Sequence, residues 1–317
     1  MTLTTKLSSV MGGKLLGKGV SKLRSEVAYR AELMKHIGRL PALSQEDRKL
    51  CEQLKQTGVV RTSLASLGLS LTPQLMQATR EMVPQLQRAS VVGNLSDNVR
   101  SAASHCLYGD PVAIAQKYSA IHLWGLQDRL LDILENYYGA PVSCIGVNMR
   151  RDIADGKQKG TKLWHIDWED RKVMKIAIYL NDVDDDGGPF EYIPLESSPS
   201  YRDFPSSAIY DKDMEKVVSR SKWVACKGPT GTVVFADNAK LFHHGRTPLR
   251  DRYTIFYAYA YRQPKRPEAC EKSPWRKGIP YLADKLTQRQ KDSIWNYEGL
   301  PIIPDVVKDR ALADVRS

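Results

Sequence analysis

Two residues of types that bind metal ions stand two positions apart near the middle of the chain. Segment 162–168 reads Lys-Leu-Trp-His-Ile-Asp-Trp and contains His165 and Asp167. If the segment is an extended strand, alternate side chains point the same way, so this imidazole and this carboxylate share one face. Two side chains are too few for a stable site, so a third ligand is expected from elsewhere in the chain.

A later segment offers that third ligand. Segment 241–246 reads Leu-Phe-His-His-Gly-Arg, and only one of His243 and His244 can face the metal because neighbouring strand residues point in opposite directions. Two histidine nitrogens and one carboxylate oxygen on one side of iron(II) leave positions open for a bidentate cosubstrate and dioxygen. The residue types therefore predict an open non-haem iron site.

The order of these motifs resembles the iron(II)/2-oxoglutarate-dependent dioxygenases, and within them the phytanoyl-CoA dioxygenase-like group. The resemblance covers residues 44–261. Its specific motifs are Leu-Trp-His-Ile-Asp at 163–167, Tyr-Leu-Asn-Asp-Val at 179–183, Gly-Gly-Pro at 187–189, Ile-Pro at 193–194, Gly-Thr-Val-Val-Phe at 231–235 and Phe-His-His-Gly at 242–245. It implies an α+β, mainly β fold: a double-stranded β-helix (jelly-roll, cupin-like) core with helices packed on the outer sheet.

The resemblance also implies an iron-binding, catalytic set: His165, Asp167 and His243. The pattern of the group is His, one residue, then Gly, which His243 satisfies with Gly245 and His244 does not. His244 is then a neighbour of the metal site or a substrate contact. Related halogenases lack the carboxylate, so the retained Asp167 favours oxygen transfer or desaturation.

Four further residues are implied to bind the cosubstrate. Arg252 would pair with the distal carboxylate of 2-oxoglutarate, since a guanidinium is permanently charged and can form two parallel hydrogen bonds. Thr254, on the same face, would add a hydroxyl. Lys175 and Tyr179 face one way on another strand and are candidates for the same pocket. Arg250 competes with Arg252, but its position favours a surface ion pair.

The implied activity is oxidative decarboxylation of 2-oxoglutarate to succinate, using iron(II) and O2, coupled to hydroxylation or related C–H oxidation of a small-molecule substrate. Two alternatives stay open. One is a catalytically silent cupin-type protein that binds an anionic ligand. The other is a zinc hydrolase with the same ligand types, which would leave Arg252 without a task.

The elements that must position these residues divide the chain into three parts. Residues 1–40 form a basic extension, residues 41–262 the dioxygenase domain and residues 263–317 a C-terminal extension. Within the domain, residues 41–138 are expected to be helical and residues 139–262 to form the β core. Helices are expected at 27–37, 44–58, from Thr72 and across 112–138, with a loop over 94–109 and one C-terminal helix around 286–295.

The β core is predicted from short segments separated by Gly, Pro and Asp turns. Strands are expected at 142–149, 164–168, 173–180, 190–193, 231–235 and 253–261. The long polar segment 197–221 is either a lid over the site or a surface insertion. Trp164 and Trp168 are expected to be packing residues, and the isolated His36, His105 and His122 to be structural or surface residues.

The composition limits the classes of molecule that the protein is expected to bind. The net charge of +11 is compatible with an anionic small-molecule substrate, but the basic residues are scattered and do not predict nucleic-acid binding. Five widely spaced cysteines without a Cys-x-x-Cys pair predict neither disulfides nor a thiolate zinc site, which fits a reducing cytoplasmic or organelle interior.

No apolar run is long enough for a transmembrane segment. Residues 1–25 suit a basic tail, a presequence or an amphipathic membrane helix. The oligomeric state stays open.

Overall fold

Antiparallel pairing organises the strands of the computed structural model, which describes residues 24–90, 99–103 and 106–301. Within these residues one sheet has seven strands in the order β1-β8-β5-β10-β4-β3-β2, and the other has three in the order β7-β6-β9. The strands of the large sheet are β1 (Val59–Ser63), β2 (Val99–Ala103), β3 (Cys106–Gly109), β4 (Val142–Asp152), β5 (Met174–Tyr179), β8 (Thr232–Asp237) and β10 (Arg252–Tyr261). Those of the small sheet are β6 (Phe190–Tyr192), β7 (Val224–Cys226) and β9 (His243–Gly245).

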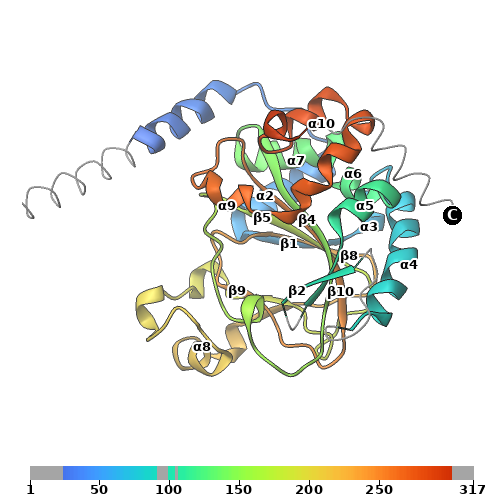
Figure 1. Ribbon diagram of the computed structural model, residues 1–317. Coiled ribbons are helices and arrows are strands. Elements are labelled where there is room, and N and C mark those ends of the chain that lie inside the picture. The colour runs from blue at the N-terminus through green and yellow to red at the C-terminus, as the bar shows by residue number, and fades with distance from the viewer. Residues whose placement is uncertain (1–23, 91–98, 104–105, 302–317) are drawn as a thin grey trace, which may run out of the picture.

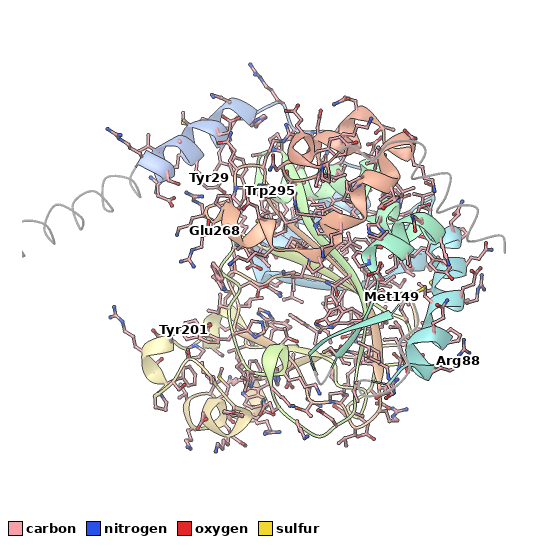
Figure 2. All side chains as sticks on the ribbon, viewed as in Figure 1. Tyr29, Arg88, Met149, Tyr201, Glu268 and Trp295 are labelled. Carbon is pink, nitrogen blue, oxygen red and sulfur yellow. The ribbon has the colours of Figure 1, made fainter. Side chains whose placement is uncertain are left out.

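Helices gather on one side of the large sheet, while α8 lies apart from them (Figure 1). The α-helices are α2 (Gln45–Thr57), α3 (Leu64–Leu67), α4 (Thr72–Arg88), α5 (Pro111–Lys117), α6 (Ala120–Leu123), α7 (Asp128–Tyr138), α8 (Asp211–Val217), α9 (Pro267–Glu271) and α10 (Gln288–Asp292). Residues 24–36 are also helical. The segment that carries Tyr201 and helix α4, which ends at Arg88, lie on opposite sides of the view in Figure 2.

Alternation along the central strands gives the large sheet two different faces. Ile176 and Ile178 of β5 and Ile255 of β10 are fully buried in the core shared with the helices. The intervening residues, such as Ala177 and Tyr179, belong to a second cluster that faces the small sheet. The predicted alternation of β5 and β10 is therefore confirmed, and it directs polar side chains of these strands toward the space between the sheets.

Local signals explain where the main helices begin and end. Ser44 accepts a hydrogen bond from the amide of Asp47 at the start of α2, and Gly58 ends the helix at φ +77°. Helix α4 starts at Thr72 with Pro73 in its first turn and continues through Pro84 to Arg88, so Pro84 does not end the helix. The predicted helices at 44–58 and from Thr72 are confirmed.

Two predictions about the strands differ from the structure. The expected loop 94–109 contains β2 and β3, so strands also occur in the part expected to be helical. Segment 164–168 is extended, but only Trp164 and His165 form β-bridges, to Ile209 and His243. The segment is irregular because its partners are single residues of two different segments.

The residues after 262 pack against the rest of the molecule. Trp275, Ile279, Leu282 and Ile294 are buried in the main core. Helix α10 lies inside the predicted helix 286–295. The extension is therefore a structural part of the molecule as far as residue 301.

Two expectations from composition can be compared with the described residues. All five cysteines are buried and free, which agrees with the absence of a disulfide framework. Among the described helices, none is both long and apolar enough to cross a bilayer. The basic tail, presequence or amphipathic membrane helix expected for residues 1–25 falls almost wholly on residues 1–23. These residues lie outside the described part of the chain, as does His105.

Candidate metal centre

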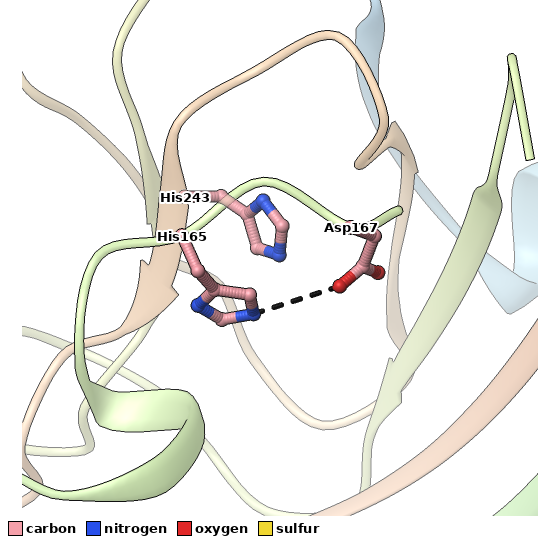
Figure 3. Close-up of side chains that lie close together, drawn as sticks. All are labelled: His165, Asp167 and His243. Carbon is pink, nitrogen blue, oxygen red and sulfur yellow. Dashed lines mark ion pairs between the residues drawn. The ribbon is translucent and has the colours of Figure 1, made fainter. Parts of the chain in front are cut away.

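Three side chains converge at one place between the sheets: His165, Asp167 and His243 (Figure 3). One potential ligand atom from each lies within 4.8 Å of the other two. His165 and His243 are paired backbone to backbone, with both N–H···O distances at 3.0 Å. The amide of Asp167 donates to the carbonyl of Asn238 at 2.9 Å, so the segment with the predicted first two ligands is fixed at both ends.

Both imidazoles are oriented by carbonyl groups two residues before them. Nδ1 of His165 lies 2.7 Å from the oxygen of Leu163, and Nδ1 of His243 lies 3.0 Å from that of Leu241. A carbonyl can only accept, so each Nδ1 donates and Nε2 is the ring nitrogen left to face a metal ion. Nε2 of His165 lies 3.6 Å from Oδ1 of Asp167, which places this nitrogen beside the carboxylate at the centre of the group.

Electrostatics keep the three groups in the forms that bind cations. Burial lowers the pKa of His243 to about 3, with the neighbouring His165 acting in the same direction, so this ring is neutral near pH 7. Burial alone would raise the pKa of the Asp167 carboxyl, but Lys175, His243 and His165 outweigh it and hold that pKa below its ordinary value. A neutral imidazole and an ionised carboxylate are the required ligand forms.

His244 has other partners. Its Nε2 lies 2.9 Å from Oε2 of Glu191 and its Nδ1 lies 3.0 Å from the carbonyl of Lys162. Its ring stacks on Trp164 with centroids 3.9 Å apart, and it is fully buried. Since both ring nitrogens lie within 3.0 Å of other groups, neither is directed at the converging side chains in this arrangement.

The three converging residues open into a cavity of about 240 Å³. Strands of both sheets form its wall. The side chains that line it include Asn148 and Arg150 of β4, Lys175, Ala177 and Tyr179 of β5, Phe190 of β6, Val234 and Ala236 of β8, and Arg252, Phe256 and Ala258 of β10. The cavity therefore places polar groups of the large sheet opposite the ligand residues.

Of the two arginines considered for the cosubstrate, Arg252 lies in the cavity and Arg250 does not. Arg252 is 2% exposed and donates to Oδ2 of Asp152 from Nε at 3.1 Å and Nη2 at 2.9 Å, and from Nη1 to the carbonyl of Gly188. Arg250 is exposed and forms an ion pair with Asp184. The expected surface ion pair of Arg250 is confirmed.

Thr254 lies between two lining residues of β10 but is not itself part of the cavity wall. Its hydroxyl is buried and has no hydrogen-bond partner among the described residues. Its neighbours across the sheet are Arg150 and Tyr179. The structure therefore places Thr254 beneath the wall, next to residues that do line the cavity.

Lys175 and Tyr179 both line the cavity, but the ammonium group of one and the hydroxyl of the other have different partners. Nζ of Lys175 lies 3.5 Å from Asp167 and 3.6 Å from Glu169. The hydroxyl of Tyr179 donates to the carbonyl of Cys226 at 2.7 Å and accepts from the amide of Phe190 at 3.0 Å. This hydroxyl therefore links the two sheets, and the ring of Tyr179 forms the wall.

Four polar residues of the site were not predicted from the sequence. Asn238 donates to Oδ2 of Asp167 at 3.2 Å and lies 2.8 Å from Nε2 of His243. Arg150 and Asp152 were missed because the strand was expected to end at 149, whereas β4 continues to 152, and Asn148 lies in the expected strand but was given no role. The alternation of Asn148, Arg150 and Asp152 would have identified them once that end was known.

The two tryptophans that flank His165 and Asp167 differ in how deeply they are buried. Trp164 is fully buried, and its Nε1 donates to Oδ1 of Asp211 at 2.9 Å, so its expected packing role is confirmed. Trp168 is 55% exposed, with the guanidinium of Arg266 4.6 Å above its ring, so the prediction that it packs in the interior is wrong.

The long segment 197–221 is anchored to the ligand segment. The carbonyl of Ile209 accepts from the amide of Trp164 at 2.9 Å, and the hydroxyl of Tyr201 accepts from the amide of Ile166 at 2.8 Å. Tyr201 thus contacts the residue between two of the converging side chains. The segment is part of the surroundings of the site, not a remote insertion.

The donor set fits a divalent transition-metal ion. Two neutral imidazole nitrogens and one carboxylate oxygen form the facial arrangement that is typical of non-haem iron(II), with positions left for exogenous ligands. The buried Arg252, which lines the same cavity, suits a carboxylate. The amide of Asn148, whose Oδ1 is buried without a partner among the described residues, leaves a polar group of the wall open to a ligand.

Comparison with known proteins gives no match by sequence: no family model and no curated protein matches the chain. Solved structures are similar at low identity. HygX from Streptomyces hygroscopicus with nickel and 2-oxoglutarate bound is 15% identical, with a TM-score of 0.46 over 69% of this chain and 88% of that one. AviO1 from Streptomyces viridochromogenes Tue57 is 16% identical, with a TM-score of 0.46 over 71% and 99%.

A third similar structure is EctD from S. alaskensis with bound Fe, 14% identical, with a TM-score of 0.46 over 72% of this chain and 82% of that one. Two of these three structures carry a metal ion, and one of the two also carries 2-oxoglutarate. The identities and TM-scores are low, so we base the function on the residues of this chain.

Proposed function

We propose that this protein is a non-haem iron(II) dioxygenase that couples decarboxylation of 2-oxoglutarate to succinate with hydroxylation, or a related C–H oxidation, of a small-molecule substrate. The observation that carries the proposal is the convergence of His165, Asp167 and His243 on a cavity that the buried Arg252 also lines. The fold we propose is the double-stranded β-helix of these enzymes, within a domain of residues 41–262.

His165, Asp167 and His243 hold the iron, and Arg252 binds the distal carboxylate of 2-oxoglutarate. Iron(II) with 2-oxoglutarate and O2 supplies the oxidising chemistry. The protein orients both imidazoles through the carbonyls that accept from Nδ1, and keeps Asp167 ionised. Lys175 and Tyr179 form the wall near the cosubstrate. Thr254, whose buried hydroxyl has no partner among the described residues, donates that hydroxyl to the same distal carboxylate.

The pairing of a facial ligand set with a buried guanidinium favours this function over its alternatives. A zinc hydrolase could use the same three ligands, but would give Arg252 no anion to bind. A silent binding protein for an anionic ligand could use Arg252, but would have no use for two imidazoles that converge on a carboxylate.

Succinate release in the presence of iron(II), 2-oxoglutarate and oxygen, measured with metabolite extracts as the source of primary substrate, tests the proposal. We expect release by the unmodified protein, loss in His165→Ala, and retention in His36→Ala, because His36 lies on the N-terminal helix and pairs with Glu32. Metal-dependent hydrolysis without 2-oxoglutarate would support the zinc alternative instead. Binding of 2-oxoglutarate without any turnover would support the silent protein.

A further inference from the structure

Two guanidinium groups in the cavity meet on one carboxylate. Nε of Arg150 lies 3.2 Å from Oδ2 of Asp152, and the same oxygen accepts from Nε and Nη2 of Arg252 at 3.1 and 2.9 Å. Arg150 and Arg252 both line the cavity, and all three residues are less than 9% exposed. The proposed function uses Arg252 and gives Arg150 no task.

The cluster carries one positive charge more than it can neutralise by itself. Burial and the adjacent Asp152 raise the pKa of the Cys106 thiol to about 12, and burial raises the pKa of the Tyr108 phenol, so both neighbours stay neutral. Among the described residues no second carboxylate bonds to either guanidinium of the pair. An unbalanced buried charge is costly unless an anion joins it.

The positions of the two arginines show where that anion would lie. In the pairing of β10 with β4, Arg252 stands opposite Asp152 and Thr254 stands opposite Arg150. Since both guanidinium groups bond to a common oxygen, an anion at the free edge of Arg252 is close to Arg150 as well. Arg252 uses three of its five N–H donors on protein acceptors, so two remain for that anion.

Arg150 is held in place for such a contact. Its guanidinium lies 4.3 Å from the ring centroid of Phe256, another lining residue, and its Nε is fixed by Asp152. Asn148, two residues earlier on the same face, has an amide oxygen, Oδ1, that is buried without a hydrogen-bond partner among the described residues. Arg150 is therefore an ordered cation in the wall and not a mobile surface side chain.

We propose that Arg150 is a second binding residue for the distal carboxylate of the oxo-acid cosubstrate, aligned with Arg252 by the shared Asp152. The inference rests on the proposed function and deepens it. The two guanidinium groups around one anion make the site select an oxo acid with a distal carboxylate over one of equal length without it. Asp152 acts as a positioning residue, because it orders both cations without filling the place of the ligand.

The test is a comparison of two oxo acids in binding, not in turnover. Protein loaded with iron(II) without oxygen is titrated with 2-oxoglutarate and with 2-oxovalerate, which has the same chain length but no distal carboxylate, and the charge-transfer absorption gives each Kd. We expect Arg150→Met to weaken 2-oxoglutarate binding by about tenfold to a hundredfold, the range for a hydrogen bond to a charged group. Its Kd for 2-oxovalerate should stay within about twofold of the unmodified value, about 0.4 kcal/mol.

Two further variants keep the result clear. Arg150→Lys keeps the charge but not the planar fork, so it should weaken 2-oxoglutarate binding by less than Arg150→Met, and it replaces that variant if Arg150→Met does not fold. Arg250→Gln removes an exposed arginine two residues from Arg252 and should change neither Kd.

Equal effects of the Arg150 variants on both oxo acids, or no effect on 2-oxoglutarate, would overturn the role of Arg150 while leaving the proposed function standing. No absorption band for the unmodified protein with either oxo acid would overturn both.

Discussion

His243 and His244 are adjacent in β9, but their rings have different partners: His243 belongs to the converging group, and His244 stacks on Trp164 and bonds to Glu191. The difference follows from strand geometry, in which neighbouring side chains point in opposite directions. It also separates two proposed functions, metal binding and support of the buried interior, between adjacent residues of the same type.

The two histidines should therefore respond differently to substitution. We expect His243→Ala to lose stoichiometric iron binding with a modest change in stability. His244→Ala should keep iron binding but lower the free energy of unfolding by about 3 kcal/mol, because Glu191 loses a buried partner. Iron content by elemental analysis and urea unfolding of the apoproteins measure the two effects. Iron loss in His244→Ala alone would contradict this assignment of the two histidines.

Asp211 connects the segment 197–221 to the metal centre. Its Oδ1 accepts from Nε1 of Trp164 at 2.9 Å and from Gln158 at 2.6 Å. We expect Asp211→Ala to increase proteolytic cleavage within 197–221 and to weaken iron binding by about tenfold, the scale of effects from residues that support metal ligands. Asp213→Ala is the matched control, since Asp213 lies in the same helical turn and pairs only with the exposed Lys216. Equal sensitivity of both variants would show that Asp211 has no special connection.

The ligands could be predicted from the sequence because they depend on residue type and short spacing. His165 and Asp167 are two residues apart, and His243 is followed by Gly245, so local patterns identify all three. Arg252 could be predicted for the same reason, from its place at the start of a clearly alternating strand.

The rest of the site depends on long-range pairing, which local patterns do not encode. Arg150 lines the cavity and Asp152 bonds to Arg252 because β4 extends along β10 as far as Arg252, and a polar strand end of this kind has no local signal. Trp168 resembles a core residue by type alone, yet the chain turns away from the interior after Asp167 and leaves it exposed. Strands β2 and β3 were missed because their segment is polar and pairs at the edge of the sheet.

The buried His122 predicts how stability depends on pH. This residue is 1% exposed, its ring nitrogens have no hydrogen-bond partner among the described residues, and burial lowers its pKa to about 4. Between about pH 6.5 and 4 the unfolded chain binds this proton and the folded chain does not, so stability falls as the pH is lowered through this window.

Replacing His122 should therefore reduce that pH dependence. We expect His122→Leu to lose about 3 kcal/mol less stability than the unmodified apoprotein between pH 7 and 4, since one pKa unit corresponds to about 1.4 kcal/mol. Urea unfolding at a series of pH values measures the difference. The pKa of His243 is also lowered, and this residue is present in both proteins. The measured quantity is therefore the difference in stability change between His122→Leu and the unmodified protein. Parallel pH profiles would contradict the role of His122.

The visible absorption spectrum of the protein with iron(II) and 2-oxoglutarate, recorded without oxygen, tests the central claim most directly. A metal-to-ligand charge-transfer band requires the oxo acid to chelate an iron held by His165, Asp167 and His243. We predict that the band appears with the unmodified protein and with His36→Ala, and is absent with His165→Ala. A spectrum without the band in the unmodified, folded protein, or an undiminished band in His165→Ala, would contradict the assignment of this site.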